Sequence, residues 1–154
     1  MGGRGEEKAS MISKIIALCG PGGAGKTSTL KHFADDLVLT GAQQKSLWIS
    51  TKNKNDVIRI LEYHGRRICI SSYGDEPAGI KEGYAKAVKS DCDVFITASR
   101  VKDKCNALKC VKNLARKSGL SPIYIGAVRE PSAKLRAKTD LQRLRVLRVV
   151  LEFA

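Results

Sequence analysis

The chain has 154 residues, of which 43% are hydrophobic, and it carries a formal net charge of +13. This length fits a single domain with a sizeable core, which we place at residues 11–154 after a flexible tail at residues 1–10. No apolar run is long enough to span a bilayer and no signal peptide is recognisable, so we expect a cytoplasmic protein without a membrane partner. The positive charge favours anionic partners: a nucleotide, a nucleic acid or an acidic protein.

The cysteines agree with a cytoplasmic location. There are five of them, an odd number, and none forms a Cys-x-x-Cys pair. This pattern is typical of reduced thiols and argues against a disulfide framework or a zinc site.

An apolar run that ends at Cys19 leads directly into a glycine-rich segment, Gly20–Thr27. The segment reads G-x-x-x-x-G-K-T, the spacing of a phosphate-binding loop. Glycines let main-chain N–H groups turn toward an anion, and we expect Lys26 to reach the β- and γ-phosphates and Thr27 to bring its hydroxyl to Mg²⁺. The residues expected to contact the nucleotide are Gly20, Pro21, Gly22, Gly23, Ala24, Gly25, Lys26, Thr27 and Ser28.

A helix is predicted after this loop, starting near Lys26 and ending before Gly41. Its first N–H groups and its dipole would point at the same anion as the loop. The apolar side chains recur with helical spacing and predict a buried stripe. That stripe consists of Leu30, Phe33, Ala34, Leu37 and Val38.

The middle of the chain alternates strand and helix patterns. A strand at residues 45–51 precedes two β-rich runs, 56–63 and 66–72, which the His64-Gly65 turn predicts as a hairpin. Pro77 ends the hairpin and opens a helix. The inward positions of that helix are Ile80, Tyr84, Ala87 and Val88.

The remaining elements are a strand at 93–100, a helix at 105–117 and a strand at 122–128. The segment 141–151 reads as a helix with four leucines inward, although its β-branched residues leave a strand open. Those leucines are Leu141, Leu144, Leu147 and Leu151. Strands that alternate with helices predict an α/β fold, with a mostly parallel sheet covered on both faces and an early antiparallel hairpin.

Two acids follow the second arm of the hairpin. We expect Asp75 to hold Mg²⁺ through water and Glu76 to orient the attacking water, because the carboxyl ends of parallel strands face the phosphate-binding loop. A solvated turn that carries two acids before a proline is the alternative. Asp91 and Asp93 precede their strand, so we place them at the opposite edge of the sheet.

The next strand tip carries Thr97, Ser99 and Arg100. A polar residue there, Ser99, is expected to sense the γ-phosphate, and Arg100 to neutralise charge in the transition state. A strand end followed by an ordinary basic loop is the alternative. Residues 50–52, at the tip of the strand before the hairpin, are a candidate site for an acceptor substrate.

The order of these motifs resembles the P-loop NTPase superfamily over roughly residues 12–128. The segment from the hairpin through Arg100 also resembles small stand-alone ATPases of phages and bacterial mobile elements. The resemblance implies a three-layer αβα fold with ATP and Mg²⁺ as ligands. We expect adenine as the base.

Two segments, 100–117 and 129–148, carry much of the positive charge. Such segments are typical either of a surface that contacts a phosphate backbone or of an ordinary solvated face. Few aromatic residues interleave them, so a base-stacking platform is not expected. The basic residues at 100–104 also fit a mobile lid over the phosphates, as in small kinases.

Three functions follow from these patterns. The first is an ATPase that hydrolyses Mg²⁺–ATP to switch or drive a larger assembly, with nucleic acid as one candidate partner. The second is a small kinase that passes the γ-phosphoryl group to a nucleotide or metabolite. The third is a nucleotide-gated binding module with little turnover, and an oligomer is compatible with all three.

Overall fold

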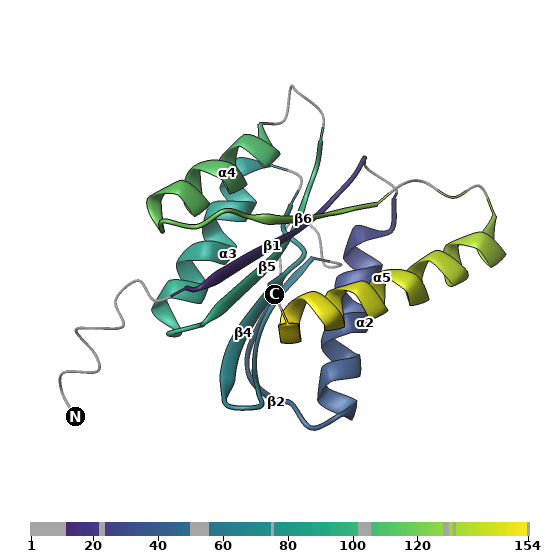
Figure 1. Cartoon of the computed structure of the whole chain (residues 1–154), viewed down its shortest axis with the longest axis horizontal. Coiled ribbons are helices and arrows are strands. Elements are labelled where there is room, and N and C mark those ends of the chain that lie inside the picture. The colour runs from purple at the N-terminus through teal and green to yellow at the C-terminus, as the bar shows by residue number, and fades with distance from the viewer. Residues whose placement is uncertain are drawn as a thin grey trace.

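The structure is a computed structural model that describes residues 12–21, 24–49, 56–74, 76–101, 106–127, 130 and 132–153. Within these ranges the chain forms one six-stranded sheet between two layers of helices (Figure 1). One layer holds α2 (Lys26–Leu39) and α5 (Ala133–Phe153). The other layer holds α3 (Pro77–Lys89) and α4 (Ala107–Lys117). The α/β class and the two covered faces agree with the sequence prediction.

The sheet has the strand order β2-β3-β4-β5-β1-β6. Its strands are β1 (Lys14–Cys19), β2 (Gln43–Ile49), β3 (Val57–Tyr63), β4 (Arg66–Ser71), β5 (Val94–Ser99) and β6 (Ile123–Gly126). The pairs β4/β5, β5/β1 and β1/β6 are parallel, whereas β3 is antiparallel to both of its neighbours. The sheet is therefore mixed. Its antiparallel part is larger than expected, because β2 also pairs with β3 and lies at the sheet edge.

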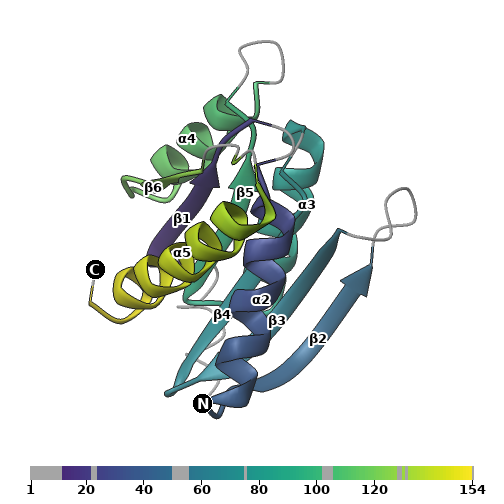
Figure 2. The same ribbon diagram turned by 90° about the vertical axis from the view of Figure 1, so that its right-hand side faces the viewer.

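The central strands β1 and β5 are buried along their whole length. They carry apolar residues on both faces because helices cover both faces. One core lies under α2 and α5 and contains Phe33, Leu37 and Leu147. The other lies under α3 and α4 and contains Ile80 and Phe95. Figure 2 shows α2 and α5 side by side over the sheet, with β2 at the far edge.

The predicted hairpin turn is present between β3 and β4. His64 and Gly65 have φ values of 50° and 77°, which is the left-handed conformation that a type I′ hairpin turn requires at both central positions. The ring of His64 stacks on Tyr63, with 4.0 Å between ring centroids. The turn fixes the register of the hairpin and so fixes which residues reach each end of the sheet.

Segment 141–151 is helical and belongs to α5, but the prediction that all four of its leucines face the core is wrong for Leu141. Leu147 and Leu151 are buried, whereas the side chain of Leu141 is 58% exposed. At about 100° per residue, Leu141 lies about 120° around the helix from Leu147. Arg143, four residues before Leu147, takes the inward position and is buried. Val38 in α2 likewise lies at the margin of its stripe and is 39% exposed.

The C-terminal turn of α5 is held by two cations from the sheet. Lys14 Nζ donates to the carbonyls of Val150 and Leu151 at 3.0 and 3.1 Å, and Arg66 Nη1 donates to the carbonyl of Leu151 at 2.8 Å. These bonds satisfy carbonyl groups that a helix end leaves without intrahelical partners. Burial, followed by the nearby positive charge of Arg66, lowers the pKa of Lys14.

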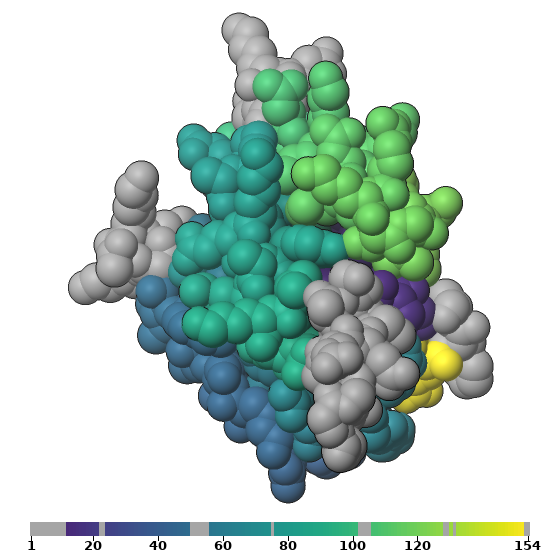
Figure 3. Space-filling model, turned by 90° about the vertical axis from the view of Figure 1, so that its left-hand side faces the viewer, coloured from purple at the N-terminus to yellow at the C-terminus, as the bar shows by residue number. Residues whose placement is uncertain are grey.

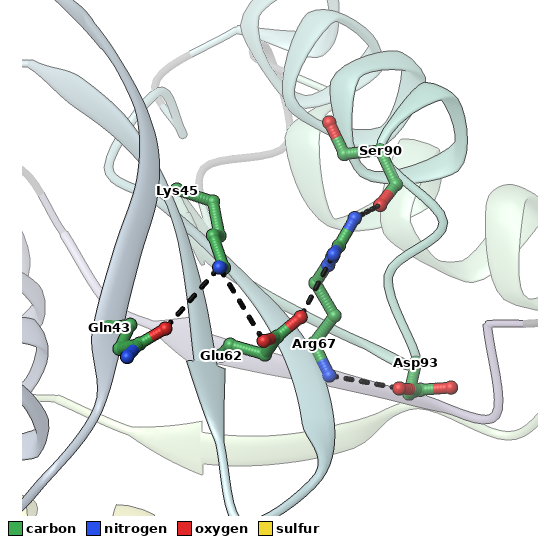
Figure 4. A network of polar contacts seen from close by, with 6 residues as sticks. All are labelled: Gln43, Lys45, Glu62, Arg67, Ser90 and Asp93. Atoms are coloured by element: carbon green, nitrogen blue, oxygen red, sulfur yellow. Dashed lines mark hydrogen bonds and ion pairs between the residues drawn. The ribbon is translucent and has the colours of Figure 1, made fainter.

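A polar network joins β2, β3, β4 and the start of β5 at the end of the sheet opposite to the glycine-rich loop (Figure 4). Arg67 Nη2 pairs with Glu62 at 2.9 Å and Arg67 Nη1 donates to the carbonyl of Ser90 at 3.0 Å. Lys45 lies 3.6 Å from the same Glu62 carboxylate. Asp93 accepts a bond from the main-chain N–H of Arg67 at 2.9 Å, which confirms that this acid lies at the opposite edge.

Candidate functional site

The carboxyl ends of four parallel strands meet at one edge of the sheet. The main-chain N–H of Gly20 donates to the carbonyl of Ser99 at 3.1 Å, and the N–H of Ala127 donates to the carbonyl of Cys19 at 2.6 Å. The N–H of Arg100 donates to the carbonyl of Gly74 at 3.0 Å. These bonds bring the segments that follow β1, β4, β5 and β6 next to the start of the glycine-rich loop.

Two glycines of the loop are required for different reasons. A Cβ added to Gly20 would lie 2.2 Å from the carbonyl oxygen of Ala127, so this glycine allows the chain leaving β1 to pack against the chain leaving β6. Gly25 has a φ of 81°, a left-handed conformation that disfavours other residues, and it forms the N-cap of α2. For Gly20, packing within the sheet is therefore a sufficient reason without any phosphate. Gly22 and Gly23 lie outside the described residues.

Lys26 is the first residue of α2 and is only 6% exposed. Its ammonium donates to the carbonyls of Gly20 and Pro21, both at 2.7 Å. No side chain caps the N-terminus of α2. A buried ammonium thus lies beside Gly20 and Pro21 at the uncapped start of a 14-residue helix, and both of these features attract an anion.

Thr27 and Ser72 gather around a carboxylate that the sequence reasoning did not select. Thr27 Oγ1 donates to Asp56 Oδ1 at 3.4 Å, and Ser72 Oγ donates to the same oxygen at 3.0 Å. Asp56 directly precedes β3. Since β3 runs antiparallel to β4, its first residue lies at the edge where β4 ends, and this reversed direction is the signal that the sequence offered.

Of the two acids proposed after β4, one is described by the structure. Glu76 is the N-cap residue of α3 and is exposed, and its carbonyl accepts bonds from the N–H groups of Gly79 and Ile80 at 3.1 and 3.3 Å. It stands at the predicted edge of the sheet, two residues after Gly74. Asp75 and residues 50–52 lie outside the described residues, so their proposed roles remain predictions.

The three polar residues predicted at the tip of β5 differ in position. Thr97 is fully buried and pairs with Ala17 and Ser71 inside the sheet, so it does not lie at the tip. Ser99 is the last residue of β5 and is also fully buried, and its hydroxyl donates to the carbonyl of Arg100 at 3.2 Å. Arg100 is half-buried and follows directly. Ser99 therefore contacts the loop through its main-chain carbonyl.

A cavity of about 330 Å³ lies between the first turns of α2 and the first half of α5. Asp140 accepts a bond from Thr29 Oγ1 at 2.7 Å, and its other oxygen lies 2.7 Å from His32 Nδ1. Arg143 Nη1 donates to the carbonyl of Ala24 at 2.7 Å. Arg143 thus attaches α5 to the glycine-rich loop and Asp140 attaches it to the first turns of α2. Gly25 and Ser28 also line the cavity. No sequence pattern predicted this role for α5.

Cys19 lies beside the loop but is not suited to nucleophilic chemistry. Burial raises the pKa of its thiol to about 11, and the positive charge of Lys26 lowers it by less than burial raises it. Its thiol donates to the carbonyl of Ala17 at 3.4 Å. The protonated thiol is a weak nucleophile, so the chemistry of this edge rests on hydroxyl, carboxylate and ammonium groups.

Among the described residues, no three His, Cys, Asp or Glu side chains come together as a metal-binding group. The hydroxyl of Thr27 and the carboxylate of Asp56 are hard oxygen donors of the kind that Mg²⁺ prefers. Mg²⁺ in nucleotide sites is held by one or two such groups together with phosphate oxygens and water. The residues present therefore fit a nucleotide-bound Mg²⁺ and do not form an independent metal centre.

Comparisons of the chain with protein-family models, with curated proteins and with solved structures give no significant match. In the part of the chain that the structure describes, no helix combines the length and the apolar character needed to cross a membrane.

Proposed function

We propose that the chain binds Mg²⁺–ATP at the Gly20–Thr27 loop and hydrolyses it. The observation that carries the proposal is the ammonium of Lys26, buried inside the loop and bonded at 2.7 Å to two main-chain carbonyls at the uncapped start of α2. Burying an ammonium is costly, and phosphate oxygens compensate for that cost through charge-assisted hydrogen bonds. The G-x-x-x-x-G-K-T spacing of the sequence independently indicates a nucleotide phosphate as the ligand.

The roles of the residues follow from their positions. The main-chain N–H groups at the start of α2 bind phosphate oxygens, and Lys26 places its charge against the β- and γ-phosphates. Glu76 accepts a proton from the attacking water. The water oxygen bonds to the γ-phosphorus, the bond to the bridging oxygen breaks, and ADP and inorganic phosphate leave. Mg²⁺, when bound, neutralises phosphate charge, and Thr27 would hold it.

The cavity between α2 and α5 is the proposed place of the nucleoside. It adjoins Gly25 and Ser28 at the start of α2, so a triphosphate held by the loop has its nucleoside end within reach of this space. A volume of about 330 Å³ lies at the lower end of the range for small-molecule sites. Asp140 and Thr29 offer hydrogen-bonding groups there. The sequence contains Asn53-Lys54-Asn55-Asp56, which has the Asn-Lys-x-Asp spacing typical of guanine recognition, so the preference for adenine stays a prediction.

The proposal is tested by measuring ATP binding and phosphate release for the wild type, K26A and K31A. Lys31 lies on the same helix and is a matched loss of one positive charge outside the loop. We expect K26A to weaken ATP binding by about 100-fold or more, because a charge-assisted contact to phosphate is lost, and K31A to bind as the wild type does. Circular dichroism of K26A checks that the fold persists.

The outcomes separate the three functions. Phosphate release to water supports the ATPase, and transfer to an added nucleoside or metabolite without release to water supports the kinase. Binding without either reaction supports the nucleotide-gated module. Equal ATP affinity of K26A and wild type would contradict all three, because each depends on the loop.

A nucleic acid is the partner that the charge of α4 favours. Lys109, Lys112, Arg116 and Lys117 are all exposed on this helix, which contains no acidic residue. Hollows of about 570 and 750 Å³ flank α4, toward α3 and toward β6 respectively. Figure 3 shows the face on which α3 and α4 lie side by side. Such a charged surface suits a phosphate backbone.

The nucleic-acid part has its own test. Addition of DNA or RNA should stimulate phosphate release at low salt, and the stimulation should fall as salt rises. The double variant K109E/R116E should lose the stimulation while its basal release is unchanged. K89E, an exposed charge reversal at the end of α3, should retain it. Equal stimulation of both variants would remove α4 as the contact surface.

A further inference from the structure

We propose that Asp56 is a ligand of the Mg²⁺ that accompanies the nucleotide, together with Thr27. This inference rests on the proposed function and adds to it a metal ligand that lies outside the acidic pair after β4. It concerns the one described carboxylate whose contact with the hydroxyl of Thr27 the structure records.

The carboxylate of Asp56 contacts hydroxyl groups from two elements, and Ser72 holds it more closely than Thr27 does. Thr27 Oγ1, in the first turn of α2, lies 3.4 Å from Asp56 Oδ1, and Ser72 Oγ, just after β4, lies 3.0 Å from the same oxygen. Ser72 is itself held, because its hydroxyl accepts a bond from the N–H of Val57 at 2.9 Å and its N–H donates to the carbonyl of Val57 at 2.9 Å. The carboxylate is thus positioned before any ligand binds.

The topology explains why this acid reaches the loop. In a parallel sheet an acid at this edge has to follow a strand, as Glu76 does. Asp56 instead precedes β3, which runs antiparallel to both β2 and β4. The hairpin therefore delivers an acid to the same edge from the opposite chain direction, and its position is set by the β3/β4 register up to Ser71.

The chemistry suits Mg²⁺ in particular. The three side chains offer one carboxylate and two hydroxyls, all hard oxygen donors, and Thr27 already lies in the position where the loop pattern expects a Mg²⁺ ligand. The 3.4 Å contact between Thr27 and Asp56 is long for a hydrogen bond between oxygens, so the hydroxyl exchanges this partner for an ion at little cost. In this arrangement Asp56 repels phosphate when metal is absent and attracts it through the ion when metal is present.

The effect of Asp56 on phosphate affinity is therefore expected to reverse when metal is added. A merely structural role of Asp56 would not produce this reversal, so the reversal can be tested. The affinity for a fluorescent ATP analogue is measured for wild type and D56N in EDTA and in Mg²⁺. We expect the gain in affinity on adding Mg²⁺ to fall about tenfold or more in D56N, while its affinity in EDTA stays equal to that of the wild type or rises. D35N, an exposed carboxylate loss on α2, should keep the full gain.

A structural role of Asp56 would instead lower the affinity equally in EDTA and in Mg²⁺, and that result would overturn the inference. D56N that retains the whole Mg²⁺ gain would also overturn it, while leaving the proposed function intact. If the wild type binds no nucleotide in EDTA or in Mg²⁺, both the proposed function and the role of Asp56 are contradicted.

A measurement on the wild type keeps the inference testable if D56N does not fold. Mn²⁺ bound together with ADP should broaden the amide signals of Val57 and Ser72 in the NMR spectrum. The signal of Glu62, about 17 Å further along β3, should remain sharp. Sharp signals for Val57 and Ser72 in the presence of saturating Mn²⁺–ADP would contradict a metal ligand at Asp56.

Discussion

The two ends of the sheet both collect polar side chains, but they engage them differently. At the end shown in Figure 4, charges pair with opposite charges, as Arg67 and Lys45 do with Glu62. At the loop end, the recorded contacts of Lys26 are with main-chain carbonyls and those of Asp56 are with hydroxyls. The first arrangement stabilises the hairpin. The second brings an ammonium, a carboxylate and hydroxyls next to the start of α2, where a phosphate and its metal ion would bind.

Helix α5 runs between the two ends of the sheet, and its contacts also serve different purposes at its C-terminus and near its middle. Near its C-terminus Lys14 and Arg66 bind helix carbonyls and serve the fold. Near its middle Arg143 binds the carbonyl of Ala24 and serves the loop. The comparison therefore predicts that substitutions at the loop end alter ligand binding, whereas substitutions at the other end alter only stability.

The largest effect is expected from G20A. The added Cβ would lie 2.2 Å from the carbonyl oxygen of Ala127, so the exits of β1 and β6 must move apart. We expect a loss of about 3 kcal/mol in the free energy of unfolding, measured in urea, and a loss of ATP binding. G126A is the control, because nothing lies within 4 Å of its added Cβ. A G20A variant as stable as G126A would contradict the packing described for the loop.

A smaller effect is expected from R143A. This substitution removes a buried bond of 2.7 Å to the carbonyl of Ala24 in the loop. The free energy of unfolding should fall by about 2 kcal/mol, and ATP binding should weaken as well because the loop is less well held. R145A, two positions along on the exposed side of α5, should change neither quantity. Unchanged ATP binding in R143A would show that this contact of α5 does not contribute to nucleotide binding.

R67A should affect stability alone. Its guanidinium joins Glu62 to the carbonyl of Ser90, and its loss should lower the free energy of unfolding by about 1 kcal/mol. ATP affinity, measured by titration calorimetry, should equal that of the wild type. A changed affinity would show that the two ends of the sheet are coupled and would break the comparison.

The smallest effect concerns pH. The hydrogen bond from Arg67, followed by the charge of Lys45, lowers the pKa of Glu62 below its ordinary value of 4.5. The resulting stabilisation is complete above the pKa that the Glu62 carboxyl has in the unfolded chain. It is lost as the pH falls through the lower pKa that this carboxyl has in the folded chain. E62Q should therefore flatten the decline in melting temperature below pH 4.5 and leave the melting temperature at pH 7 slightly lowered. Identical acid profiles of E62Q and wild type would exclude this contribution.

Much of the fold was predictable because local patterns and tertiary structure agree. Three signals act within a few residues, and the elements they predict are present. They are the helical spacing of apolar residues up to Leu37, the turn at His64-Gly65 and the proline at position 77. Leu141 was misplaced because the inward face of α5 is set by its contact with α2. At that contact a buried Arg143 replaces the apolar residue that periodicity expects.

The candidate site was predictable only in part. The Gly20–Thr27 loop is contiguous in sequence, so its spacing alone identified Lys26 and Thr27. Asp56 was missed because it reaches the loop only through the reversal of β3, which depends on the pairing of the whole hairpin. Asp140 and Arg143 were missed because they contact α2 and the loop, respectively, from a helix more than 100 residues away in sequence.

The most direct test of the central claim is an NMR titration of the wild type with Mg²⁺–ATP and with Mg²⁺–tripolyphosphate. If the loop holds the triphosphate tail, both ligands will shift the amide signals of Gly25, Lys26 and Thr27, and K26A will lose these shifts. Shifts confined to another region, such as the basic face of α4, or no shifts at millimolar ligand would contradict the account.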